Sequence, residues 1–297
     1  MTGAFRVTQR SLSETALAGL QTSLTRLGTL QEQMTSGKLL NKPSDSPTGT
    51  IQAMDFRADI RTQEQYSRNA DDGVGWLGII DSTLGTMGDQ VQRARELTLQ
   101  GISSGAASSP EGRQSIATEI DSIRNGLIAG ANTTYLGRPV FGGTTSGSVA
   151  YDANANYVGD SGSVNRTVGN GVSVQVDASG PATFGTGTGQ IFTVLAMISN
   201  DLKTNPGALT ADLAQLDTAS STMLAQRADV GARYNRITQM KQNADNRTID
   251  LKTQLSDVED IDLPKTITEL QLQQTAYQAA LSATAKVLQP SLMDFLK

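Results

Sequence analysis

The residues of this chain that could do chemistry are carboxylates, because the sequence contains neither histidine nor cysteine. The chain therefore has no imidazole base, thiolate nucleophile or zinc–thiolate site. An enzyme would have to rely on carboxylates, Lys or Tyr, for example Asp152 paired with Asp160 or Asp177. We therefore predict a protein with no catalytic, cofactor-binding or metal residues, one that is not an enzyme.

Asp152, Asn154 and Asn156 alternate with alanines and resemble the start of a calcium loop. In such a loop, oxygen ligands at alternate positions surround the ion, with a glycine at the sixth position and a bidentate Glu at the twelfth. Those positions are occupied here by Tyr157 and Ser163. A turn-rich loop is the better interpretation.

Two further segments invite a chemical hypothesis. The glycines at 185, 187 and 189 could cradle a phosphate, but no Lys-Ser/Thr follows them, so a flexible loop before a helix is favoured. Asp257, Glu259, Asp260 and Asp262 crowd into six residues and could suggest acid–base or metal chemistry. Acids just before a helix start also stabilise the positive end of its dipole, so we interpret this cluster as structural.

The elements that carry these residues are mostly long helices. Both ends of the chain have apolar residues three and four apart, the heptad spacing of a coiled coil. No other apolar element lies near them in the sequence, so these seams are predicted to be subunit interfaces of a homo-oligomer. The interface residues are Leu17, Leu20, Leu24, Leu27, Met34, Leu263, Ile267, Leu270, Tyr277, Leu281 and Leu288.

Each terminal seam ends at a break, and the two breaks resemble an interdomain joint. Gly37 suits a helix C-cap, Pro43 and Pro47 set a turn, and the residues between them, Ser44, Asp45 and Ser46, can cap the next helix. The predicted joint comprises Gly37, Pro43, Ser44, Asp45, Pro47, Glu259, Asp260, Asp262 and Pro264.

Long helical patterns lie between the joints. One runs from about Gly49 to Leu99, and another begins at Ser109-Pro110, an N-cap followed by a first-turn proline. Helix returns near Gln190, and one heptad register continues from Leu213 to Val258. Arg93, Arg95 and Glu96 fall on a solvated helix face, where salt bridging or subunit contact is expected.

Residues 137–189 differ, since they are rich in glycine, poor in charge and carry the alternating Val172, Val174 and Val176 of a strand. A small β domain is predicted there, with disorder as the alternative. The fold class is therefore mainly α with a β insert, a long antiparallel helical bundle built from both chain halves. The domains are 1–40 with 263–297 (terminal helices), 41–136 with 190–262 (long bundle), and 137–189 (surface-exposed insert, expected at the far end of the bundle).

Composition excludes several partners. A net charge of −5 and a pI near 4.9 leave no basic patch for nucleic acid or for an anionic membrane. No apolar run is long enough for a transmembrane helix, and the opening MTGAFRVTQRSLSET lacks the apolar segment of a secretory signal. If the protein is extracellular, another export route is expected.

Several motifs together resemble the flagellin superfamily, in particular its hook–filament junction adaptors. The resemblance covers about residues 5–145 and 190–297, with departures at Leu39 and Ser46. Its motifs are Met34–Lys38 with Ser44–Pro47, Asn69–Gly73, Gln92–Leu97, Gly137–Thr144, Ser256–Asp262 and the ending Tyr277–Leu296.

This resemblance implies a structural, self-assembling junction protein of the bacterial flagellum. Its implied partners are hook-associated protein 1, flagellin and a flagellar export chaperone, and its implied route out of the cell is the flagellar type III export apparatus. The paired terminal helices would form the inner core of a tube. Filament flagellin is the alternative, and a secreted adhesin or binding module on a helical stalk is a more distant one.

Overall fold

The computed structural model of the protein describes residues 9–103 and 109–288. The chain forms two compact units, each built from both halves of the sequence. The terminal unit comprises Met1–Arg61 with Ile249–Lys297, and the central unit comprises Thr62–Thr248. Most described residues are helical and the strands are short, which confirms the predicted fold class.

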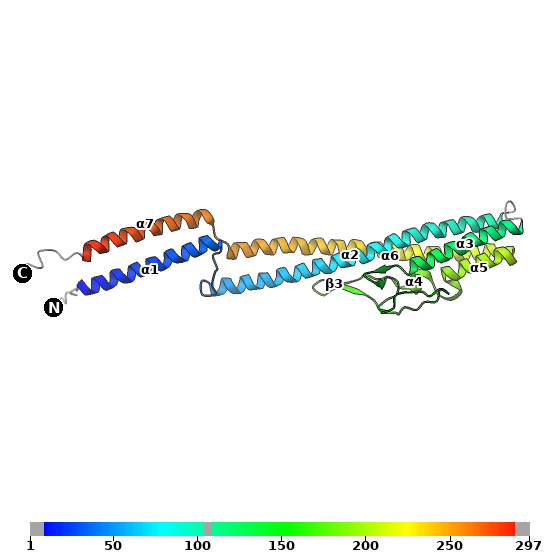
Figure 1. The fold of residues 1–297 in the computed structure, drawn as a ribbon, viewed down its shortest axis with the longest axis horizontal. Helices are drawn as coiled ribbons and strands as arrows, with labels where there is room; N and C mark the ends of the chain where they lie inside the picture. The colour runs from blue at the N-terminus through cyan, green and yellow to red at the C-terminus, as the bar shows by residue number, and fades with distance from the viewer. Residues whose placement is uncertain (1–8, 104–108, 289–297) are drawn as a thin grey trace, which may run out of the picture. The chain divides into compact units, whose positions relative to one another are not determined.

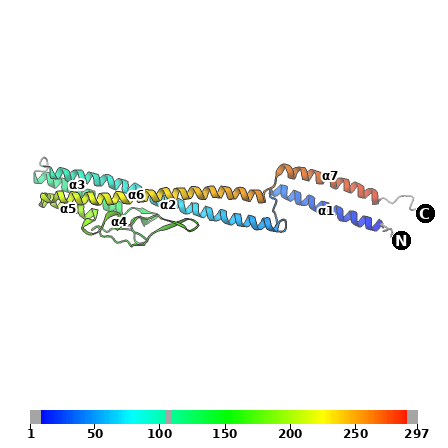
Figure 2. The same ribbon diagram turned by 180° about the vertical axis from the view of Figure 1, so that it is seen from behind.

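Two helices of the terminal unit, α1 (Gln9–Ser36) and α7 (Leu263–Leu288), lie side by side (Figure 1; Figure 2 from behind). Gln273 Nε2 on α7 donates a hydrogen bond to the Ser23 carbonyl of α1 at 3.3 Å. The less exposed positions of both helices are spaced alternately four and three apart, as heptad packing requires. They are Ala16, Leu20, Ser23, Leu27, Leu30 and Met34 on α1, and Thr266, Leu270, Gln273, Tyr277, Ala280 and Thr284 on α7.

The central unit is a helical bundle of α2 (Pro47–Ile102), α3 (Pro110–Ala131), α5 (Ile191–Thr204) and α6 (Leu209–Glu259), of which α2 and α6 extend into the terminal unit. As predicted, α3 begins at Ser109, whose Oγ accepts a hydrogen bond from the Gly112 amide. Apolar residues of α2 that keep a heptad-like spacing of three and four are all buried: Trp76, Ile80, Leu84, Met87, Val91 and Ala94.

Ion pairs tie α2 to α6 along their length. Arg95 Nε lies 2.7 Å from an Asp217 oxygen, Arg227 Nε lies 2.9 Å from Asp81, and Lys241 Nζ lies 2.5 Å from Asp71. The paired residue numbers rise on one helix as they fall on the other, so the two helices are antiparallel. Salt bridging by the Arg93–Glu96 segment is confirmed, because Arg93 also pairs with Glu119 at 2.8 Å.

One interruption of the helices differs from the sequence-based expectation. The sequence predicts helix from near Gln190 and one register from Leu213 to Val258, without a break between them. In the structure, α5 ends at Thr204 and α6 begins at Leu209. Asn205-Pro206-Gly207 lies between them, with a 3-10 turn at Pro206–Ala208. Asn-Pro and Pro-Gly are both turn signals, so the sequence itself indicates this break.

The segment between α3 and α5 contains two antiparallel hairpins, β1 (Thr134–Tyr135) with β2 (Arg138–Pro139) and β3 (Asn165–Gly169) with β4 (Val172–Gln175). The short helix α4 (Gly180–Phe184) follows. The segment packs against the flank of the bundle, while the ends of α3 and α5 extend further (Figure 1). The prediction that placed it at the far end of the bundle is therefore wrong.

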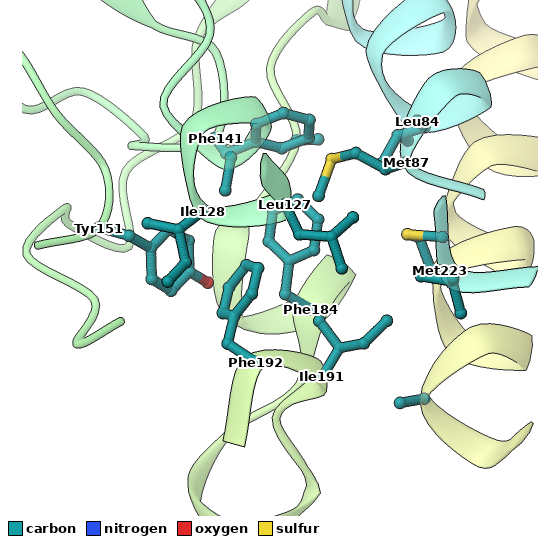
Figure 3. Packing of buried hydrophobic residues seen from close by; sticks show 14 of the residues in the cluster. Leu84, Met87, Leu127, Ile128, Phe141, Tyr151, Phe184, Ile191, Phe192 and Met223 are labelled. Carbon is teal, nitrogen blue, oxygen red and sulfur yellow. The ribbon is translucent and has the colours of Figure 1, made fainter. Parts of the chain in front are cut away.

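The core of the central unit joins this segment to the helices. Phe141, Tyr151 and Phe184 from the segment interdigitate with Phe192 of α5 and with Leu127 of α3 (Figure 3). Ring centroids of Phe141 and Phe184 are 5.0 Å apart, and those of Tyr151 and Phe192 are 5.2 Å apart. Edge-to-face aromatic contacts of this kind stabilise beyond the area they bury. Segment and bundle thus share one hydrophobic core.

Candidate assembly surface and joint

The carboxylates that could have formed an acid–base pair are hydrogen-bonded to their own loops. Asp152 Oδ1 accepts from the Asn154 and Asn156 amides at 2.8 Å each. The Asn156 side chain also donates to Asp152, and this bond lowers the pKa of the carboxyl most strongly. The calcium-loop likeness is therefore a local turn in which the backbone satisfies the aspartate.

Asp160 and Asp177 likewise accept hydrogen bonds from backbone amides. The Thr144 amide and hydroxyl and the Gly162 amide donate to Asp160 at 2.7, 2.8 and 2.9 Å, and the Thr144 amide bond is the largest cause of its lowered pKa. Asp177 is buried and accepts from the Val164 amide at 2.8 Å, and desolvation raises its pKa. Both carboxyls hold chain segments together and leave no free pair for acid–base chemistry.

The described residues contain neither a candidate metal site nor a candidate membrane span. No group of three or more acidic side chains within them is arranged to hold a metal ion. None of the described helices combines the length and the apolarity that a membrane span requires. The glycines near 185–189 form a tight turn, with Gly185 at φ +80° as the C-cap of α4, directly before α5.

The predicted interface residues divide into two sets. Leu20, Leu27, Met34, Leu270 and Tyr277 are partly buried and belong to the seam between α1 and α7. The second set is exposed and lies outside the seam positions, and we call it the outer stripe. It comprises Leu17 (58% exposed), Leu24 (53%), Leu263 (52%), Ile267 (40%) and Leu281 (44%). The side chain of Leu288 lies outside the described residues.

The terminal unit buries very few apolar side chains. Among its described residues only Leu30, Ala53, Ile60 and Leu251 count as buried apolar positions, whereas the main core cluster runs from Ala70 to Ile237 in the central unit. More than half of the exposed large apolar side chains of the described chain are nevertheless in the terminal unit. Beyond the outer stripe they are Leu39, Ile51, Met54, Ile249 and Leu272.

Sequence reasoning missed these additional residues for a simple reason. It followed one heptad register at each end of the chain, and Leu272, which is 70% exposed, lies off that register. It also omitted Leu30, which is buried in α1, the helix that packs on α7, and lies three residues after Leu27. The spacing of Leu27 and Leu30 could have revealed this second apolar row.

At the joint, two connecting segments pair with each other. Gly37, at φ +71°, ends α1, a left-handed conformation that glycine adopts without strain. Lys38 and Asp260 then form an antiparallel bridge, in which the Leu39 amide donates to the Glu259 carbonyl at 2.6 Å. The Ile261 amide donates to the Gly37 carbonyl at 3.2 Å. Backbone hydrogen bonds therefore hold the two connecting segments of the joint together.

Charged side chains reinforce this bridge. Lys38 Nζ lies 2.5 Å from Asp260 Oδ1, and Arg57 on α2 lies 2.5 Å from Glu259 Oε1. The hydrogen bond to Lys38 is the largest cause of the lowered pKa of Asp260, followed by the bond from Ser256. The same bond to Asp260 raises the pKa of Lys38. Sequence reasoning named Glu259 and Asp260 and placed Lys38 in a joint motif, but it missed Arg57 and the pairing of these charges, since no local pattern links them.

The remaining joint residues cap and turn the chain. Ser46 Oγ accepts from the Gly49 amide at 3.1 Å and Asp262 Oδ1 from the Lys265 amide at 3.1 Å, so these residues are the N-caps of α2 and α7. Asp45 instead accepts from the amides of Asn41 and Lys42. Pro47 and Pro264 occupy the first turns of α2 and α7, while Pro43 and Ser44 are exposed in the turn.

The segment Asn69–Gly73 is where the β3–β4 hairpin and α6 dock onto α2. Asn69 Nδ2 donates to the Thr167 carbonyl at 2.7 Å, and Asp72 pairs with Arg166 at 2.5 Å. Gly73 is buried, and a Cβ there would lie 3.0 Å from Val176 Cγ1 and still closer to Ile237 Cδ1. The motif thus has a packing role.

Comparison with known proteins identifies the class to which this architecture belongs. Residues 7–146 match the model of the bacterial flagellin N-terminal helical region, and residues 213–296 match that of the C-terminal helical region. The chain belongs to the flagellin family, whose members are structural proteins of the bacterial flagellum and are not enzymes.

Within this family the chain is similar to flagellar hook-associated protein 3. It is 25% identical to that protein of Escherichia coli over 292 residues, which cover 90% of this chain and 92% of the relative. It is also 26% identical to flagellin of Bacillus subtilis over 269 residues, covering 87% and 88%. The flagellar junction protein FlgL of Legionella pneumophila shares the fold, with a TM-score of 0.57 and 18% identity over 71% of this chain and all of that structure.

Proposed function

We propose that the chain is the adaptor at the hook–filament junction, joining hook-associated protein 1 on the hook side to the flagellin filament. The observation that carries the proposal is the composition of the terminal unit, whose exposed apolar side chains outnumber its buried ones. A helix with apolar side chains on several faces is stable when other subunits surround it. The outer stripe and its neighbours therefore form the contact surface between copies.

Burial of this surface between copies would favour assembly. Fully burying one Leu or Ile side chain contributes about 1.5–3 kcal/mol. The five members of the outer stripe retain about half of their surface for such burial. Neighbours that covered them would gain several kcal/mol per subunit, on the order of 5 kcal/mol, before Leu272, Ile51 and Met54 are considered.

Two features favour an adaptor over filament flagellin. The segment Gly137–Thr144 resembles that of hook-associated proteins, and two relatives named hook-associated protein 3 align over 92% and 94% of their own length, slightly more than the 88% of the Bacillus subtilis flagellin. Deleting the gene separates the two functions. Loss of an adaptor releases unpolymerised flagellin into the medium, whereas loss of flagellin leaves hooks without filaments and nothing to release. The second result would overturn the proposal.

The family also suggests the route to this location. We propose that the chain is held by a flagellar export chaperone, leaves the cytoplasm unfolded through the flagellar type III apparatus and folds outside the cell. Export that persists in a strain lacking that apparatus would contradict this. The binding-module alternative is difficult to test by trimming residues 140–188, because Phe141 and Phe184 are in the shared core. Substituting exposed Val149 and Val158 tests it without opening that core.

A further inference from the structure

The most buried charge of the joint is Glu259, whose side chain is only 6% exposed. Two cations reach it from different segments, Arg57 on α2 at 2.5 Å and Lys38 on the connection at 3.7 Å. Each cation is about half exposed, and ion pairs of exposed groups contribute little to stability. A buried carboxylate that loses its partner is much more damaging, because its desolvation is no longer offset.

Glu259 also connects the parts of the joint through its backbone. Its carbonyl accepts the Leu39 amide, and the next residue, Asp260, holds the Lys38 ammonium. Asp260 is fixed from its other side by Ser256 Oγ at 2.5 Å. Displacing the Glu259 side chain would therefore disturb the bridge between the two connecting segments. All these groups lie in the terminal unit.

We propose that Arg57 is a positioning residue for assembly, which acts through Glu259 to lock the bridge between residues 37–39 and 259–261. The proposal rests on the proposed assembly function, since a locked joint matters where many copies must present their terminal helices alike. Arg57 also borders a pocket of about 340 Å³ lined by Leu40, Pro43, Ala53 and Met54. Its removal would leave Glu259 facing that pocket without its closest cation.

Substitutions at this position separate charge from packing. Arg57→Met keeps an apolar stem but removes the charge, and Arg57→Lys keeps the charge on a different group. The double variant Arg57→Glu with Glu259→Arg restores an ion pair with the two charges exchanged; we call it the reversed pair. Arg61→Met is the matched control, since Arg61 is exposed one helical turn further along α2. Trp76 fluorescence verifies that the central unit of each variant remains folded.

Hydrogen exchange of the Leu39 and Ile261 amides measures the lock in the full-length monomer, because both amides donate across the joint. Arg57→Met should accelerate their exchange about tenfold or more relative to Arg61→Met, since the bridge opens more often. Arg57→Lys should fall between the two, and the reversed pair should recover most of the protection. Unchanged exchange in Arg57→Met would overturn the lock.

Assembly is measured in cells as flagellin released into the medium by a deletion strain carrying each variant. Arg57→Met should release more flagellin than Arg61→Met, and the reversed pair should release less than Arg57→Met. Faster exchange with unchanged assembly would overturn the positioning role. If the wild-type gene fails to retain flagellin, the proposed function fails, whereas the exchange measurement still decides whether the lock exists.

Discussion

The close approach of α2, α6 and the β3–β4 hairpin at Gly73 gives a quantitative prediction. Replacing a helix-interior glycine by alanine ordinarily stabilises the helix by about 1 kcal/mol. At Gly73 the new methyl group would clash with Ile237 Cδ1 and press on Val176 Cγ1, both from fully buried side chains. Overpacking of this kind costs about 1–3 kcal/mol.

Gly88 provides the matched control in the same helix, because a Cβ there meets nothing within 4 Å. We expect Gly88→Ala to raise the free energy of unfolding by about 0.5–1 kcal/mol and Gly73→Ala to lower it by about 1–2 kcal/mol. Trp76 is the only tryptophan and is buried in the central unit, so its fluorescence during denaturant unfolding reports this unit.

A second substitution tests whether the clash is the cause. Ile237→Val removes the Cδ1 atom and alone costs about 0.5–1.5 kcal/mol. Combined with Gly73→Ala it should cost less than the sum of the two single changes, by about 1 kcal/mol. If Gly73→Ala stabilises the unit as much as Gly88→Ala does, the reasoning from close packing is refuted.

Three further predictions concern the turns and the joint. Leu136 has φ +49°, a left-handed conformation that strains a residue with a Cβ, and its side chain is 79% exposed. Leu136→Gly should therefore raise the free energy of unfolding by about 0.5–1 kcal/mol in the same fluorescence assay, and a decrease would contradict this argument. Asp160 has a lowered pKa, so its contribution is present above the unfolded-state pKa of about 3.9 and is lost as pH falls through the folded-state pKa. The stability gap between wild type and Asp160→Asn should therefore be constant well above the unfolded-state pKa of about 3.9 and narrow as the pH falls below it. A gap that stays constant below that pH would be the opposing result. Ser46→Ala should lower the stability of the first turn of α2 by about 1 kcal/mol and speed hydrogen exchange at the Gly49 amide, which donates to Ser46 Oγ. Ser44→Ala should leave the exchange of that amide unchanged, and equal effects of the two substitutions would rule out Ser46 as the N-cap.

Periodicity predicted the long helices well because each repeats one apolar register over many turns. The register from Leu213 to Val258 lies in α6, and that from Trp76 to Ala94 in α2. The break at Asn205-Pro206 was not predicted, because helix was expected from near Gln190 with no break marked before Leu213. The position of the β segment depends on Phe141 and Phe184 meeting helices from distant parts of the chain. No local pattern encodes such contacts.

The same limit applies to the interface and the joint. Leu17 and Leu24 repeat every seven residues, and so do Leu20 and Leu27, so spacing alone does not say which row faces α7. The structure places the second row in the seam and leaves the first exposed. Lys38 and Asp260 are 222 residues apart, a separation at which charge pairing depends on the whole fold.

The proposed function depends most directly on the outer stripe being covered when copies assemble. Because the chain has no cysteine, Leu24→Cys and Leu281→Cys each introduce a single thiol that a maleimide can label. Both positions are exposed in the monomer, as is that of Val149→Cys, a control in the central unit. We predict rapid labelling of all three variants as monomers, and protection of about tenfold or more in isolated flagella for the thiols introduced by Leu24→Cys and Leu281→Cys. Equal labelling of these two variants in monomer and flagellum would contradict the proposed assembly surface.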